Sequence, residues 1–136
     1  MPEPRTPAVD PDLGRFLSLF HEGKYWDSHE ALEHAWRRNA SAFYKGLILY
    51  ASAFVHAGRG NRHGVEAQLR KTIRQLEPFT PAYLGFDVDA VLDHARRCLD
   101  RVEAGEEGSR LPPPVLDWDG ARVRGDEMEL DQRHES

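Results

Sequence analysis

Two titratable side chains, His29 and Glu33, lie on one face of a predicted helix where apolar residues would be usual. In the segment 25–38, YWDSHEALEHAWRR, His29, Leu32, Glu33 and Trp36 follow the spacing i, i+3, i+4 and i+7. On a helix these positions share one side. An imidazole and a carboxylate buried there cost free energy unless each finds a polar partner. The spacing therefore predicts a polar cluster on this face.

The same residues could take part in metal chemistry. The order HEALE resembles the zincin pattern H-E-x-x-H, in which two histidines bind zinc and the glutamate is the base. Glu33 occupies the place of the second histidine, so a metal site would need His29, Glu33 and a third ligand, for which His56 is the candidate. Such a site would hold a divalent metal such as zinc. The alternative, which we favour, is a cluster without a cofactor, in which Glu33 also pairs with Arg37.

Other catalytic chemistries have less support. The Glu-x-x-His motif of ferritin-like di-iron sites does not occur, since Glu30 and His34 are four residues apart. The single cysteine, Cys98, can form neither an intramolecular disulfide nor a cysteine-based zinc site. It lies beside the apolar stripe of a predicted helix, where a cysteine usually serves as a small hydrophobic residue.

Five helices are predicted to position these side chains in a compact all-α bundle. The first predicted helix is capped by Asp10, has Pro11 at its start and ends at Gly23, and the second is capped by Asp27, with Glu30 completing a capping box. The third is predicted over Phe43–Ala57, and the fourth over Arg62–Glu77 with Asn61 as its cap. The fifth is capped by Asp87 and ends at Gly105. The third is apolar on nearly every side, so we expect it at the centre. No strand pattern is evident.

The two ends of the chain differ from its middle. Residues 1–9 contain three prolines and no apolar periodicity, which predicts a flexible leader before a helical domain over 10–105. Residues 106–136 are predicted to form a Pro-containing arm and an acidic tail. Val115, Leu116 and Trp118 are the residues expected to anchor this arm on the domain. Residues 117–136 hold seven acidic residues against three arginines, so most of the net charge of −5 belongs to the tail.

Composition excludes several classes of protein. The chain has no apolar run of the roughly 20 residues that a membrane span requires. It has no basic excess and no nucleic-acid-binding motif, so nucleic acid is not an expected partner. An apolar signal segment is missing from its start, and we expect a cytoplasmic location.

Three segments of the chain form an ordered set of motifs. They are H-E-x-L-E-x-x-W, present as His29, Glu30, Leu32, Glu33 and Trp36; the apolar helix from Gly46-Leu47-Ile48 to Arg59-Gly60-Asn61 and Gly64; and Pro81, Leu84, Gly85 and Asp87. Taken together, they resemble domain-of-unknown-function family 309. The resemblance spans roughly residues 20–92 and implies an all-helical fold with no assigned activity. One departure concerns the glutamines that flank the G-L-I segment in the family, because this chain has Lys45 and Leu49 there.

Two functions remain open from the sequence. The first, which we favour, is a non-catalytic module that binds a protein or a small ligand around the HEALEHAW helix. The second is a metal-dependent, hydrolase-like enzyme that uses His29, Glu33 and His56. The sequence fixes neither the partner nor the oligomeric state. The candidate binding residues are Trp26, His29, Glu30, Glu33, Trp36, Arg37, His56 and Arg59.

Overall fold

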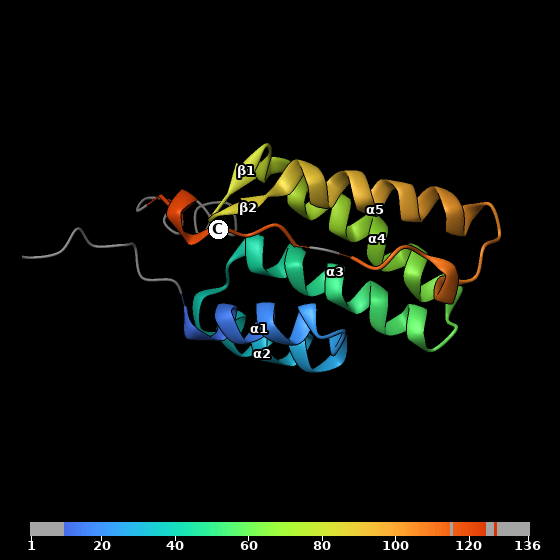
Figure 1. The fold of residues 1–136 in the computed structure, drawn as a ribbon, viewed down its shortest axis with the longest axis horizontal. Coiled ribbons are helices and arrows are strands. Elements are labelled where there is room, and N and C mark those ends of the chain that lie inside the picture. Colours follow the sequence, from blue (N-terminus) through green and yellow to red (C-terminus); the bar gives the residue numbers. More distant parts are fainter. Residues whose placement is uncertain (1–9, 115, 125–126, 128–136) are drawn as a thin grey trace, which may run out of the picture.

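Within residues 10–114, 116–124 and 127, which the computed structural model describes, five α-helices carry the fold (Figure 1). They are α1 (Pro11–His21), α2 (Tyr25–Asn39), α3 (Ala42–Gly58), α4 (Arg62–Leu76) and α5 (Val88–Glu103). The short 3-10 helix η1 (Glu77–Phe79) comes directly after α4, and two more, η2 (Gly108–Arg110) and η3 (Gly120–Arg122), follow α5. The predicted all-α bundle of five helices is confirmed.

Side-chain caps explain where four of the helices begin. The capping residues are Asp10 for α1, Ser41 for α3, Asn61 for α4 and Asp87 for α5, and each side chain accepts a hydrogen bond from a backbone N–H of the first turn. Such caps satisfy donors that have no partner within the helix. The predicted caps at Asp10, Asn61 and Asp87 are confirmed.

The predicted start of α2 is wrong. The helix begins at Tyr25, before Asp27, and its N-cap Lys24 makes no side-chain hydrogen bond. Its entry is fixed instead by tertiary contact: Gly23 adopts a φ of 80°, and the Tyr25 ring then packs edge-on against Phe20 at a centroid distance of 5.3 Å. Glu30 consequently lies within the helix and is not a capping group.

α3 is the central helix, as predicted. It packs between α2 on one side and α4 on the other, while α1 covers α2 and α5 covers α4 (Figure 1). Most of its side chains are buried in the common hydrophobic core. Gly46 permits the close approach of α4, because a Cβ atom at that position would lie 2.3 Å from Leu76 Cδ2.

A short antiparallel strand pair follows η1, where the sequence predicted no strand. Its strands, β1 (Ala82–Tyr83) and β2 (Phe86–Asp87), have two residues each, which is too short to show an alternating pattern. Segment 116–119 of the arm continues this pairing. Asp87 N–H donates to the Asp117 carbonyl at 3.1 Å, and Asp119 N–H donates to the Gly85 carbonyl at 2.9 Å.

The arm runs back over the helices and is held by side-chain hydrogen bonds along its length (Figure 1). His21 Nε2 donates to the Leu116 carbonyl at 3.1 Å, and Trp118 Nε1 donates to the Leu84 carbonyl at 2.9 Å. Leu116 is buried and Trp118 packs against the core. The third expected anchor, Val115, lies outside the described residues, as do the predicted leader and most of the predicted tail. Among the helices described, none is long and apolar enough to cross a membrane.

Candidate functional site

The exposed indole of Trp26 marks the first turn of α2. Trp26 is 50% exposed, and it is the one large hydrophobic residue at the surface of the described part of the chain. His29 stacks against it, with ring centroids 5.6 Å apart and an interplanar angle of 11°. Arg59, which follows α3, holds its guanidinium carbon 5.4 Å from the Trp26 ring centroid. A single aromatic ring is thus contacted by an imidazole and by a cation.

A cavity of about 250 Å³ opens beside this ring. It is lined by Trp26, His29, Glu30, Glu33 and Arg37. Arg37 Nη2 donates to Glu33 Oε1 at 2.8 Å. Within the described residues, the exposed Glu30 carboxylate makes no hydrogen bond or ion pair. We call these five residues, together with Arg59, the Trp26 surface.

His29 is held neutral by its surroundings. Its Nδ1 atom is buried and makes no hydrogen bond with any described residue. Glu33 Oε2 lies 3.5 Å from Nδ1, a close approach that lacks hydrogen-bond geometry, so the contact is electrostatic. Desolvation lowers the pKa of His29 below its ordinary value, and the nearby Glu33 and Glu30 charges oppose this shift. The imidazole is therefore an uncharged group with one unused polar atom.

Two of the predicted binding residues, Trp36 and His56, are not part of the Trp26 surface. Trp36 is partly buried and packs against the core, with the Lys45 ammonium 4.8 Å from its ring centroid. Its Nε1 is buried without a hydrogen-bond partner among the residues described. His56 lies beside the turn after α3, where its Nδ1 is 3.1 Å from Asn61 Nδ2. Lys45 thus places a cation over Trp36.

The three residues considered for a metal are not assembled. Only His29 and Glu33 lie at the cavity, and His56 lies in the last turn of α3, next to Asn61. In the described part of the chain, no group of three or more His, Cys, Asp or Glu side chains could hold a metal ion. The predicted pairing of Glu33 with Arg37 is present.

A buried polar network around His94 was missed by the sequence analysis. Tyr50 donates its hydroxyl to His94 Nδ1 at 2.6 Å, and His94 Nε2 donates to the Pro112 carbonyl of the arm at 3.0 Å. Cys98 Sγ lies 3.6 Å from His94 Nε2, and burial raises the pKa of this thiol to about 11. Cys98 is therefore a neutral thiol and no nucleophile at neutral pH. One feature of the sequence could have indicated this network, namely that His94 lies beside the apolar stripe of α5.

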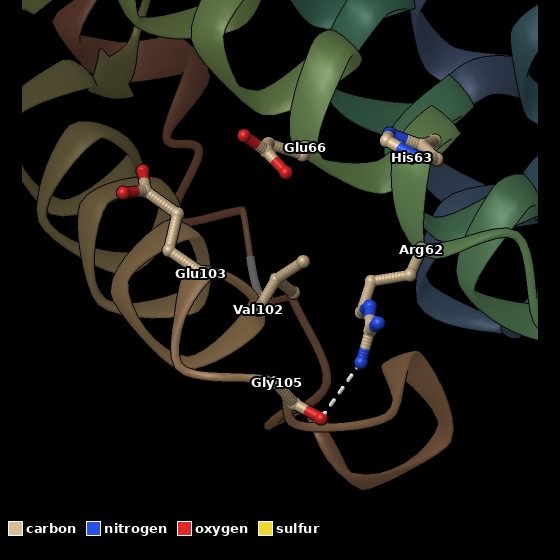
Figure 2. Close-up of a pocket in the computed structure, with 6 residues that line it drawn as sticks. All are labelled: Arg62, His63, Glu66, Val102, Glu103 and Gly105. Atoms are coloured by element: carbon tan, nitrogen blue, oxygen red, sulfur yellow. Dashed lines mark hydrogen bonds between the residues drawn. The ribbon is translucent and has the colours of Figure 1, made fainter.

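A second cavity, of about 360 Å³, lies between the start of α4 and the end of α5 (Figure 2). Figure 2 shows Arg62 extending to the Gly105 carbonyl, to which it donates at 2.9 Å. The two carboxylates of this cavity, Glu66 and Glu103, both pair with Arg70, at 2.8 and 3.2 Å. These charges satisfy one another, whereas the Trp26 surface keeps unpaired charges beside an exposed ring. We therefore take the Trp26 surface as the candidate site.

Comparison with known protein families gives a match over part of the chain. Residues 13–67 match the family described as Domain of unknown function (DUF309). This confirms the resemblance found in the sequence and covers α1, α2, α3 and the start of α4. No curated protein and no solved structure matched the chain significantly.

Proposed function

We propose that the chain is a non-catalytic binding module that recognises a protein or a small ligand through the Trp26 surface. The observation that carries this proposal is the half-exposed Trp26 ring beside a cavity. An exposed tryptophan leaves a large apolar area in water, and a partner that covers it gains hydrophobic free energy. Tryptophan and arginine are also the residue types most enriched among binding hot spots.

The polar groups around Trp26 favour binding over catalysis. General acid–base catalysis needs a group that gains or loses a proton at the site. Glu33 is already engaged by Arg37, and the Nδ1 atom of His29 is buried out of reach of a substrate proton. Glu30 has a free carboxylate that can accept hydrogen bonds from a partner. This arrangement supplies an apolar platform with polar groups at its edge, which is typical of a recognition surface.

Fragment binding observed by NMR tests the proposed function. We would titrate the ¹⁵N-labelled chain with a mixture of small aromatic, carboxylate and guanidinium compounds. The expected result is a titrant-dependent shift of the Trp26 indole N–H and of the backbone amides of His29 and Glu30. Shifts confined to residues outside the Trp26 surface, or no shifts at all in a chain that stays monomeric, would contradict the proposal.

Matched variants give this experiment its control. Trp26→Ala removes the ring and should abolish the fragment-induced shifts. Lys71→Ala changes an exposed residue on α4, away from this surface, and should leave them unchanged. Far-UV circular dichroism would establish that both variants keep their helical content.

A further inference from the structure

The Trp26 surface carries unpaired charges of both signs. Arg59 is exposed, contacts the Trp26 ring and makes no ion pair with any described residue. Glu30 is exposed one helical turn after Trp26 and is likewise without an ion pair in the described part of the chain. Most other charged groups near α2 are paired: Glu33 with Arg37, and Arg38 with Asp10 and Asp12.

The two unpaired charges are separated along α2. The turn at Ala40 joins the end of α2 to the start of α3, so these helices run in opposite directions. The end of α3 therefore lies beside the start of α2, which places Arg59 next to Trp26. Glu30 lies one turn further along α2. This order places the cation at the start of α2, beside the aromatic ring, and the anion one turn further along.

A surface with this order is complementary to itself. When two copies of a chain meet about a twofold axis, each residue faces a different residue of the other copy, and the contact is repeated symmetrically. With the axis near Trp26, the two indole rings meet at the centre, and Arg59 of each copy faces Glu30 of the other. Arg59 and Glu30 of each copy then gain a partner of opposite sign, and the exposed apolar ring is covered.

From this charge pattern we infer that the partner of the Trp26 surface is a second copy of the chain, in a twofold symmetric dimer. The inference rests on the proposed function, because it names the occupant of the same surface. In this dimer, two Arg59–Glu30 pairs flank a pair of tryptophan rings. The interface thus has an aromatic centre and a polar rim. Complementary rim charges fix which surfaces meet and suppress wrong pairings.

Analytical ultracentrifugation of the full chain tests the dimer. The monomer mass is 15.5 kDa, and the weight-average mass should rise toward twice this value as protein concentration increases. Trp26→Ala should raise the dimer dissociation constant about tenfold or more, the effect of losing a hot-spot tryptophan. Lys71→Ala should leave it unchanged. A wild type that stays monomeric up to about millimolar concentration, beyond the range of specific interfaces, would overturn the inference.

Charge reversal provides a sharper test of the geometry. Glu30→Arg and Arg59→Glu should each weaken the dimer, because each places two like-charged pairs across the interface. An equimolar mixture of these two variants should recover the wild-type dissociation constant, since both pairs are again attractive in the mixed dimer. The double variant E30R/R59E should recover it as well. A dimer that forms equally well in all four samples, or a mixture that stays monomeric, would overturn the pairing.

The two proposals fail in different ways. A dimer shifts the Trp26 resonances with protein concentration, whereas a fragment shifts them with the titrant at fixed protein concentration. A chain that binds fragments at Trp26 but never dimerises would refute the dimer alone. A chain with neither response would refute both.

Discussion

At the scale of single residues, hydrogen-bond partners decide what each histidine can do. His29 and His94 both have a pKa lowered by desolvation. His94 uses both ring nitrogens, one with Tyr50 and one with the Pro112 carbonyl. His29 leaves its Nδ1 without a hydrogen bond to any described residue and lies at an open cavity. The first arrangement is structural, and the second is suited to a binding surface.

The Tyr50–His94 pair should behave as one unit when it is mutated. His94→Leu leaves the buried Tyr50 hydroxyl without its acceptor and should cost about 1–3 kcal/mol of unfolding free energy. Tyr50→Phe removes the donor and should cost about 1 kcal/mol. The double variant should cost less than the sum, because both unsatisfied groups disappear together. Urea denaturation of the four proteins measures this coupling, and strictly additive costs would show that the bond is not important for stability.

Acidification should destabilise the fold through these two histidines. Desolvation holds the folded-state pKa of His29 and of His94 below the ordinary value of 6.5. The unfolded chain then binds more protons than the folded chain once the pH falls below about 6.5, so stability is lost from that pH down to the folded-state values. Urea denaturation at about pH 7.5 and about pH 5 should show the loss.

A matched variant assigns this pH dependence. His94→Leu should reduce the difference in unfolding free energy between the two pH values, because a leucine does not titrate. An identical pH dependence in wild type and His94→Leu would show that His94 does not contribute.

At the scale of elements, local patterns predicted the helices, whereas long-range contacts determined the rest. The apolar periodicity and the caps at Asp10, Asn61 and Asp87 are properties of neighbouring residues, and all three caps are present. The start of α2 depends on the packing of Tyr25 against Phe20, which helix propensity does not reveal. The spacing of His29 and Glu33 predicted a shared face, but not the arrival of Arg59 from α3.

The packing of α3 against α4 should depend on Gly46. A Cβ atom at this position would lie 2.3 Å from Leu76 Cδ2 and 2.7 Å from its Cγ, and Leu76 is fully buried. Gly46→Ala should therefore destabilise the protein by about 1–3 kcal/mol, the usual cost of overpacking. Thermal or urea denaturation measures the change. Equal or higher stability of this variant would show that α4 moves aside freely.

Gly14→Ala is the matched control for Gly46→Ala. Gly14 lies within α1, and a Cβ atom there would meet nothing within 4 Å. The substitution should stabilise the protein by about 0.5–1 kcal/mol, because alanine loses less backbone freedom on folding than glycine. The two variants carry the same chemical change, so opposite signs isolate the steric effect of Leu76.

At the scale of the whole molecule, the arm joins parts of the fold that the helices leave apart. It contacts His21 at the end of α1, His94 on α5 and the Gly85 backbone before β2. The sequence predicted Leu116 and Trp118 as anchors because they are apolar residues after a proline run. Their partners lie far away in the chain, so no local pattern predicts where the arm docks.

Trp118 and Trp26 should respond differently to the same substitution. Trp118 packs against Phe86 and donates to the Leu84 carbonyl, so Trp118→Ala should cost about 2–4 kcal/mol, near the usual cost of removing a buried aromatic side chain. Trp26 is half exposed, and Trp26→Ala should cost less than about 1 kcal/mol in the monomer, as expected for a surface change. Chemical denaturation at low protein concentration compares them. Equal costs would contradict the docking of the arm.

The bond between His21 and the Leu116 carbonyl joins residues 95 positions apart, and this sets an order of events during folding. The pairs α1–α2, α2–α3, α3–α4 and α4–α5 are neighbours in the chain, so they close short loops and form rapidly. The arm closes the longest loops and gains its contacts only on a surface that the helices have already built. We therefore expect its docking to be the last step, so that a nascent chain completes its core only after residue 118 has been synthesised.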